Sequence, residues 1–135
     1  MSFEKALRTR LFESAPIDAL IGKTSGTPSI DWTVSPQGAA DPRIVLTTIS
    51  DPRPQTHDGP DSIRPTRVQV DVIDADRATV VALREAAIAT LMPAGTYSGI
   101  YFDRAFVDVV QDLGAQGETS FVHRDRIDFI IWHKG

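Results

Sequence analysis

Three histidines are the residues best suited to metal binding or proton transfer in this chain of 135 residues. They are His57, His123 and His133, and they lie far apart in the sequence. None begins a motif with the ligand spacing of a zinc site. His123 flanks the charged run 124–126, for which we expect a solvated strand edge. The histidines therefore predict no metal site.

Clustered carboxylates are the second candidate for chemistry, because several oxygens together can hold a cation. Asp71, Asp74 and Asp76 follow one another closely. Asp74 and Asp76 more simply form a strand-to-helix turn and cap the helix that follows. Asp58 and Asp61 resemble part of a calcium loop, but the full ligand spacing is missing. We expect no resident cation.

Motifs for nucleophilic catalysis and phosphate binding are missing from the sequence. The chain has no cysteine, which excludes thiolate nucleophiles, disulfides and cysteine-bound metals. No Gly-x-Ser-x-Gly sequence occurs. Gly22-Lys23-Thr24 ends like a phosphate-binding loop, but Ile17 stands where that loop needs its first glycine. The sequence therefore predicts neither an enzyme nor a cofactor.

Charge and hydropathy limit the partners that the chain can bind. The net charge of −4 argues against a grip on nucleic acid, which needs a basic patch. No stretch approaches the roughly 20 apolar residues that span a bilayer, and the first residues lack the apolar core of a signal peptide. We expect a soluble cytoplasmic product with no membrane partner.

The first element that could position side chains is a helix over residues 3–14. Its apolar stripe consists of Phe3, Ala6, Leu7 and Leu11. Arg10 is expected to lie off the stripe. Pro16 closes this helix or opens a short second turn over residues 16–21, and Gly22 is expected to end that turn as its C′ residue.

A longer helix is predicted from a cap at Asp74 or Asp76 to about Met92. Its apolar stripe consists of Val80, Leu83, Ala87 and Leu91. At about 1.5 Å per residue the helix is about 25 Å long, which matches one face of a small sheet. Pro93 and Gly95 end it.

Strands are predicted at residues 30–34, 43–50, 66–73, 99–111 and 121–133, with loops at 23–29, 35–42 and 112–118. The clearest strand is 66–73, in which Val68, Val70 and Val72 face one way. Its other face carries Arg67, Gln69 and Asp71, and we expect that face to be wet or paired with a partner.

The element order predicts an α+β fold: a mostly antiparallel sheet with two helices packed on one face, in a single domain over residues 1–135. The late strands, joined by a short loop, favour an antiparallel hairpin. Ile130 and Trp132 make the end of the last strand apolar on both faces. That end is either central in the sheet or covered by a neighbour, and Trp132 is either core filler or a subunit-contact anchor.

The segment 51–65 is unusual because it carries four prolines, including Pro54, together with His57. Proline cannot donate to a β ladder, so the segment is not a central strand. Its one large aliphatic side chain, Ile63, offers little apolar burial to offset the entropy of ordering it alone. We expect an exposed loop that becomes ordered on contact with a partner.

Taken in order, the segments resemble the tail terminator, or tail completion, proteins of long-tailed phages, prophages and gene transfer agents. A short N-terminal helix with a proline-broken exit is followed by a strand at residues 42–46 and a polar loop. The strand Thr66-Arg67-Val68-Gln69-Val70-Asp71-Val72 then leads directly into the helix 76–91. The chain ends in an apolar strand that finishes in Trp132-His133. The resemblance spans nearly the whole chain.

The resemblance implies a structural role without a reaction. Proteins of this family form a hexameric ring that stops growth of the tail tube and docks the tail to the head connector, and DNA passes through the ring. It implies a homo-oligomer with the tail tube protein and the head–tail connector protein as partners, assembled in the bacterial cytoplasm and carried in the particle. Six copies would carry six times the charge of −4, which repels phosphate and suits a lumen that passes DNA without binding it. Contacts with other subunits or partners are expected at Pro54, His57, Ile63, Arg67, Gln69, Asp71, Ile130 and Trp132.

Two other readings remain open. The first is a small soluble ligand-binding domain or enzyme whose site is built by residues distant in sequence, which a deep polar pocket within one chain would favour. The second is a tail-tube or head-connector subunit of the same assembly. The ring number and the role of segment 51–65 are not determined by the sequence.

Overall fold

The computed structural model describes residues 3–34, 38, 40–51, 55–56, 59–60, 63–116 and 122–134. The helices are α1 (Phe3–Phe12), α2 (Ala15–Asp18) and α3 (Arg77–Leu91). The strands are β1 (Lys23–Thr24), β2 (Thr27–Pro28), β3 (Ile30–Trp32), β4 (Arg43–Ser50), β5 (Gln55–Thr56), β6 (Gly59–Pro60), β7 (Arg64–Asp74), β8 (Gly95–Tyr97), β9 (Ile100–Phe102), β10 (Phe106–Gln116) and β11 (Val122–Lys134).

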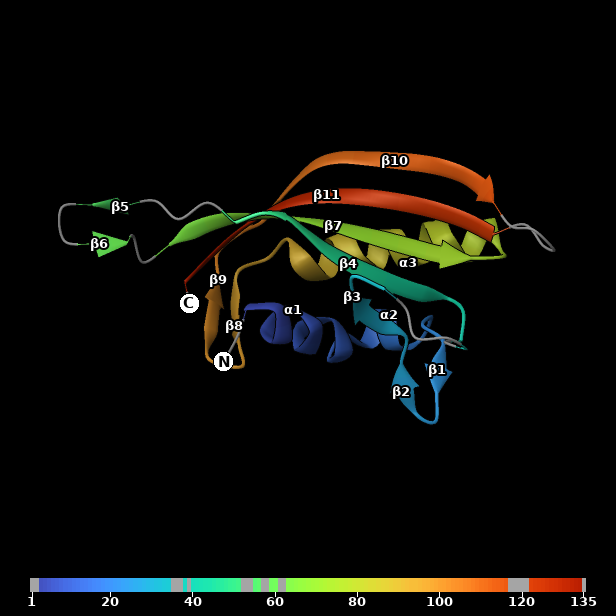
Figure 1. Cartoon of the computed structure of the whole chain (residues 1–135). Coiled ribbons are helices and arrows are strands. Elements are labelled where there is room, and N and C mark those ends of the chain that lie inside the picture. Colours follow the sequence, from blue (N-terminus) through green and yellow to red (C-terminus); the bar gives the residue numbers. More distant parts are fainter. Residues whose placement is uncertain are drawn as a thin grey trace.

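The main sheet has seven strands, and four of them follow the order β3-β4-β7-β11. Both β10 and β9 pair with the remaining edge of β11, and β8 pairs with β9. Strand β10 pairs with β11 from Val122 to Ile130, and β9 pairs with its last residues, His133 and Lys134. Every pairing is antiparallel except that of β3 with β4. Figure 1 shows the long strands β4, β7, β11 and β10 forming one curved layer.

The core face of this layer follows from alternation along β7 and β11. Val68 is opposite Phe129 and Val70 is opposite Ile127, and all four side chains are fully buried. Side chains two residues apart on a strand share a face, so one alternating run on each strand supplies the wall of the core. The prediction that the valines of β7 face inward is confirmed.

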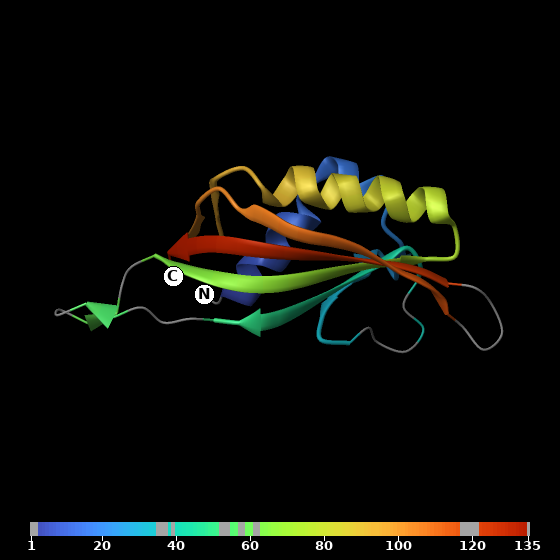
Figure 2. The same ribbon diagram turned by 90° about the horizontal axis from the view of Figure 1, so that it is seen from above.

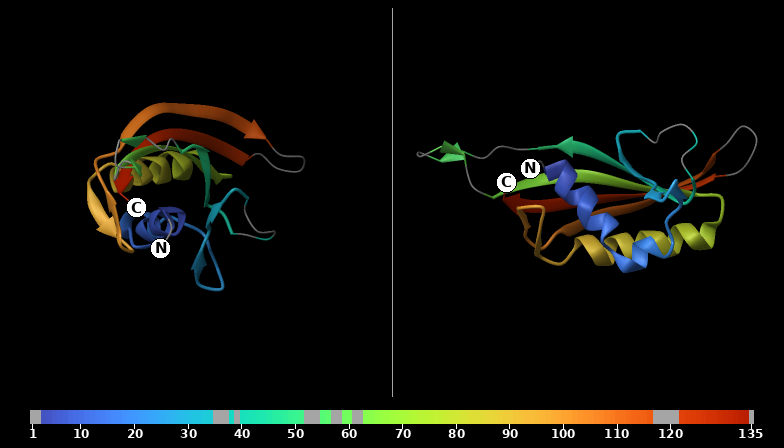
Figure 3. Two further views of the ribbon diagram at one scale, coloured as in Figure 1. Left: turned by 60° about the vertical axis from the view of Figure 1, so that its left-hand side comes forward. Right: turned by 90° about the horizontal axis from the view of Figure 1, so that it is seen from below.

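Helices α1 and α3 cover this face, and both lie on the same side of the sheet (Figures 1 and 3). The predicted stripes are the buried residues: Phe3, Ala6, Leu7 and Leu11 on α1, and Val80, Leu83, Ala87 and Leu91 on α3. Each fully buried Leu or Val contributes about 1.5–3 kcal/mol of hydrophobic free energy. The predicted fold class, an α+β fold with a mostly antiparallel sheet, is confirmed, with α2 as a short third helix. In the described part of the chain no helix is long and apolar enough to cross a membrane.

Arg10 corrects the predicted helix pattern, because it is buried and not off the stripe. Only 2% of its surface is exposed. Its guanidinium donates a hydrogen bond to the carbonyl of Pro93 and lies 4.8 Å from the ring centre of Tyr97 and 5.4 Å from that of Phe102. Burial lowers the pKa of Arg10. The hairpin β8–β9, distant in sequence, therefore covers a side chain that helical spacing assigned to solvent.

The exit from the first helices also differs from the prediction. Pro16 lies in the first turn of α2, which ends at Asp18 and has Ala19 as its C-cap, so Gly22 is not its C′ residue. A Cβ on Gly22 would lie 2.5 Å from the carbonyl oxygen of Ala40, so glycine is required there by close packing of two backbones. The predicted loop 23–29 contains the small hairpin β1–β2. The predicted strand 30–34 ends at Trp32, and Val34 is exposed.

The region after α3 holds more strands than the sequence predicted. The expected single segment 99–111 is divided between β9 and the start of β10, and β8 precedes them. Strand β10 continues to Gln116, through most of the predicted loop 112–118. A bulge between Asp112 and Ala115, with Gly114 at a φ of +82°, lets the strand pass a turn-like sequence.

Within segment 51–65, β5 and β6 form a separate two-stranded ladder. These four residues stay outside the main sheet, whereas Arg64 and Pro65 begin β7 and pair with His133 and Trp132 of β11. The expectation of a loop without a ladder is therefore wrong for β5, β6 and the first two residues of β7. We call β5 and β6 the arm, because they project beyond the ends of β4 and β7 (Figures 1 and 2). At its root Arg64 Nε lies 3.0 Å from Asp51 Oδ1, and Thr66 Oγ1 donates to the same oxygen at 3.2 Å.

Candidate interaction surface

The outer face of the sheet, opposite the helices, is formed by β4, β7, β11 and β10 and carries no helix (Figures 1 and 3). Register places Arg67, Gln69 and Asp71 of β7 beside Ile130, Asp128 and Arg126 of β11. This face therefore joins five of the predicted interface residues: Arg67, Gln69, Asp71, Ile130 and Trp132.

A buried carboxylate neutralises the centre of the outer face. Asp71 has only 3% of its side chain exposed and accepts hydrogen bonds from Arg126 Nε at 2.9 Å and from Arg124 Nε at 3.1 Å. The hydrogen bond to Asp71 raises the pKa of Arg126. Asp71 thus stabilises the pairing of β7 with β11. The expectation that its side chain is wet is wrong, and its contact with a partner stays a prediction.

The core face holds a second buried carboxylate, Asp125, which belongs to the charged run 124–126 of β11. The side chain of Asp125 is 0% exposed and binds two arginines of α3, with Arg84 Nη1 at 2.8 Å and Arg77 as the other donor. The hydrogen bond to Asp125 raises the pKa of Arg77. The prediction of a solvated charged edge at 124–126 is therefore wrong, because β11 lies between two strands. Arg124 and Arg126 pair with Asp71 across the sheet, and Asp125 pairs with arginines of α3.

The carboxylates at the end of β7 have the predicted structural role. Asp74 Oδ2 accepts the backbone N–H of Asp76 at 3.2 Å, and Asp76 is the N-cap of α3. Thr79 Oγ1 donates to Asp76 Oδ2 at 2.7 Å, and this hydrogen bond lowers the pKa of Asp76 below its usual 3.8. No group of three or more histidine or carboxylate side chains that could hold a metal ion occurs in the described residues.

His133 is buried at the far end of β11, and its partners could not be predicted from sequence. Its Nε2 lies 2.6 Å from Thr66 Oγ1 at the start of β7. The ring of Phe3 stacks on the imidazole with 4.0 Å between centroids. These contacts join the first helix, the root of the arm and the end of the chain in one packed unit.

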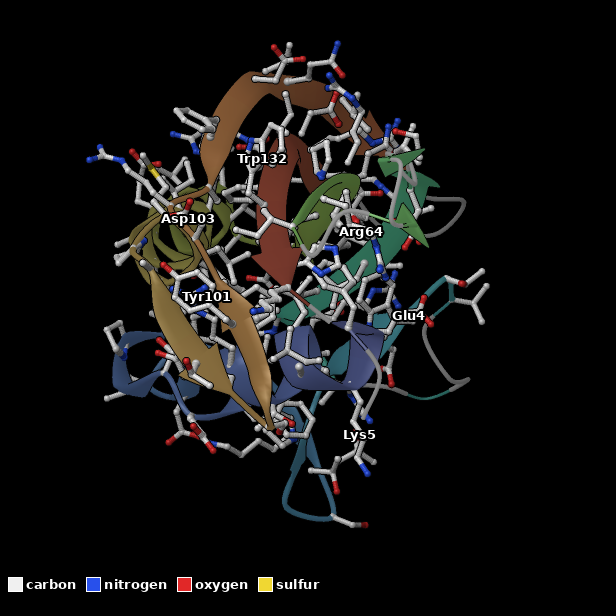
Figure 4. The ribbon with its side chains drawn as sticks, turned by 90° about the vertical axis from the view of Figure 1, so that its left-hand side faces the viewer. Glu4, Lys5, Arg64, Tyr101, Asp103 and Trp132 are labelled. Atoms are coloured by element: carbon white, nitrogen blue, oxygen red, sulfur yellow. The ribbon has the colours of Figure 1, made fainter. Side chains whose placement is uncertain are left out.

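Exposed apolar side chains gather at the end of the sheet from which the arm projects, which we call the arm end. Cross-strand register puts Ser50, Arg67, Ile130 and Phe106 in one row at this end. In that row Phe106 is 54% exposed, and beside the row Ile49 is 47% exposed and Trp132 is 36% exposed. Tyr101 and Ile63 complete the group. Figure 4 views the molecule from this end, with Trp132, Tyr101 and Arg64 labelled.

Apart from Asp71, the predicted site residues divide into three groups. Trp132 and Ile63 are exposed at the arm end, and Ile130 is half-buried beside them. Arg67 forms an ion pair with Asp108 at 2.7 Å, and Gln69 is half-buried on the outer face. Pro54 and His57 lie outside the described residues. Trp132 is 36% exposed, so its role as a subunit-contact anchor stays a prediction.

Ile49, Tyr101 and Phe106 at the arm end were not predicted as surface residues. One signal was available for Phe106. The sequence from 106 to 110 is apolar at four positions, so β10 had to present apolar side chains on both faces. The start of β10 at Phe106, after the connection 103–105 that follows β9, was hidden in the expected single segment 99–111.

The arrangement has the composition of a protein–protein contact. Aromatic side chains next to an arginine, around aliphatic groups, are enriched in the centres of interfaces.

No protein-family model matches this sequence, and a search of curated proteins finds no match. Among solved structures, the chain shares its fold with a chain of the "Virion of native gene transfer agent (GTA) particle". That match has a TM-score of 0.65 and 16% sequence identity, and covers 99% of this chain and 96% of the other.

Proposed function

We propose that this chain is a structural subunit of a gene transfer agent or related phage-like particle. The observation that carries this proposal is the fold shared with the virion chain, over nearly the full length of both proteins. A match of that coverage includes α1, the β7–α3 passage and β11, which are the segments on which the resemblance to tail terminators rests.

Within the particle, we propose the role of tail terminator: a ring that ends the tail tube and joins it to the head connector, with DNA passing through the lumen. The arm end and the uncovered outer face, which meet at Arg67, Ile130 and Trp132, supply exposed area for association with more than one partner. The protein's work is then binding, with no reaction, substrate or cofactor. The acidic balance of −4 per chain favours passage of DNA over retention.

Deletion of the gene in cells that produce the particle tests this role. The expected products are heads without attached tails, together with tails of uncontrolled length, and both defects should be restored by the intact gene. Loss of tail tubes altogether would instead indicate a tube subunit. Loss of DNA from otherwise joined heads and tails would indicate a connector subunit. Normal particles would contradict a structural role.

The mass of the purified protein tests the ring. Six chains of 14.8 kDa each give about 89 kDa, which native mass spectrometry resolves from a dimer or tetramer. We expect this mass alone or after addition of tail tube protein. A chain that stays monomeric in both conditions would favour the alternative of a small ligand-binding domain or enzyme.

A further inference from the structure

The main sheet ends on both sides in backbone that lacks a partner strand. Among the described residues, β10 pairs with β11 only, so its other edge is free. On the opposite side β3 covers Ile44 to Leu46 of β4, and within the part of the chain that the structure describes no strand pairs with this edge from Thr47 to Ser50. A free edge presents unpaired N–H and C=O groups that can bind another strand.

Exposed apolar side chains lie along the same two edges. On β10, Phe106, Val109 and Val110 are 54%, 39% and 43% exposed, and on β4 Ile49 is 47% exposed. Soluble proteins usually protect such edges with charged side chains. Here residues 47–50 carry no charge, and the one charge in residues 106–110, Asp108, is neutralised by Arg67.

Strand direction makes the two edges complementary. The four long strands alternate, since β4 is antiparallel to β7, β7 to β11 and β11 to β10. Strands β4 and β10 therefore run in opposite directions at the two sides of the sheet. Rotation about an axis along the strands preserves their directions, so it places β10 of one copy antiparallel to β4 of the next. A contact between two different surfaces, repeated by such a rotation, closes into a ring when a whole number of copies completes one full turn.

We infer that β10 of one copy pairs with residues Thr47–Ser50 of β4 in the next copy, and that this strand addition is the ring contact. The inference rests on the ring in the proposed function. Both strands carry a bulge near this contact, at Asp108 and Ile49. Bulges shorten a regular ladder. Side chains must then complete the contact, and Ile49 in one bulge faces Phe106 and Val109 beside the other.

Cysteine cross-linking tests this contact directly, because the natural chain contains no cysteine. Single variants at Thr47, Thr48 and Ser50 are each mixed with Val109→Cys or Val110→Cys under mild oxidation. Side chains opposite each other in an antiparallel pair are close enough for a disulfide. We expect at least one mixture to form a covalent dimer more than tenfold more efficiently than a control mixture of Thr96→Cys with Val110→Cys. Thr96 is exposed on β8, which lies on the same flank of the sheet as β10.

Two further results separate the possible arrangements. A chain that carries both cysteines of the successful pair should form a ladder of covalent oligomers ending in a closed ring. Val110→Cys that cross-links to itself as well as to the β4 variants would overturn the inference in favour of a two-fold β10–β10 contact. The thermal transition of each variant confirms that it is folded.

Failure of the inference can be distinguished from failure of the proposed function. A mass of six chains with no cross-link from any mixture would overturn the strand pairing and leave the ring intact. A purified chain that stays monomeric at high concentration and forms no disulfide would also overturn it. The gene deletion still measures the terminator role in either case.

Discussion

Arg84 on α3 donates a hydrogen bond to Asp125 on β11 across 2.8 Å, and the side chain of Asp125 is fully buried. Arg77 lies about two turns earlier on α3. It binds the other oxygen of the same carboxylate. One buried charge therefore holds the long helix to the central strand. Removing it leaves two arginines near the core without their partner.

Asp125→Ala is expected to lower the free energy of unfolding by about 3 kcal/mol, the lower end of the range for breaking a buried ion pair. Both arginines retain partial contact with water, which places the cost at that end. Urea denaturation at pH 7 measures the change. Asp112→Ala is the matched control, because Asp112 is 57% exposed and 3.8 Å from Arg77. It should cost less than about 0.5 kcal/mol, and equal effects of the two variants would contradict this account.

Arg10→Met is expected to leave the free energy of unfolding unchanged or to raise it by about 1 kcal/mol. The reason is that Arg10 Nε and Nη1 are buried without a hydrogen-bond partner among the described residues, while desolvation lowers the pKa of the guanidinium. Methionine has similar length and no polar group to desolvate. Differential scanning calorimetry measures the change. A loss above about 2 kcal/mol would mean that the hydrogen bond to Pro93 and the contacts with Tyr97 and Phe102 outweigh the burial cost.

Thr79→Val should raise the pKa of Asp76 toward 3.8, because the hydroxyl of Thr79 is the largest cause of its lowered value. A carboxyl group with a lowered pKa in the folded state contributes stability above the unfolded pKa. That contribution is lost as the pH falls from about 3.8 through the folded pKa. An NMR titration of the Asp76 side chain measures the shift. An unchanged pKa in the variant would show that the N-terminus of α3, and not Thr79, sets the value.

Trp132→Ala should weaken assembly more than folding. Trp132 is 36% exposed on the outer face, so its removal costs little in the isolated chain, whereas an aromatic anchor contributes about 2 kcal/mol to a contact, or about 30-fold in its dissociation constant. Trp32→Ala is the matched control. Trp32 packs against the core and its Nε1 donates to the carbonyl of Glu4 at 2.9 Å. That variant should lose about 2 kcal/mol in folding.

Native mass and thermal unfolding of both tryptophan variants separate the two effects. If Trp132→Ala assembled normally but unfolded at a much lower temperature, Trp132 would stabilise the fold and not the contact.

Removal of residues 54–61, which include the arm strands, should leave the chain folded. The root of the arm stays joined by the ion pair of Arg64 with Asp51 and by the hydrogen bond of Thr66 to Asp51. The truncated chain should form particles in which heads and tails are not joined, scored by electron microscopy and transfer activity. A variant with a Gly-Ser segment of equal length controls for chain length. Full transfer activity in either variant would show that the arm has no docking role.

Local pattern was enough to predict the parts of this fold that depend on a single segment. The alternation of Val68, Val70 and Val72 and the stripe of Leu83, Ala87 and Leu91 each repeat with the period of their own backbone. Each can be read in one segment, because burial of a strand or helix face requires that repeat whatever lies opposite. The same applies to the antiparallel pairing of β10 with β11, which follows from the short connection between them.

The surface that we assign to assembly depends on which segments lie side by side. Asp71 is buried because strand register places Arg126 of β11 beside it. Asp125 is buried because α3 packs on the sheet and brings Arg84 to it. Arg10 is buried because β8 and β9 fold over it. Trp132 and Phe106 share the arm end because β10 pairs with β11 in one register; a shift of one residue would turn each side chain to the other face. Pairing between distant strands is set by packing of the whole chain, so no period in one segment contains it.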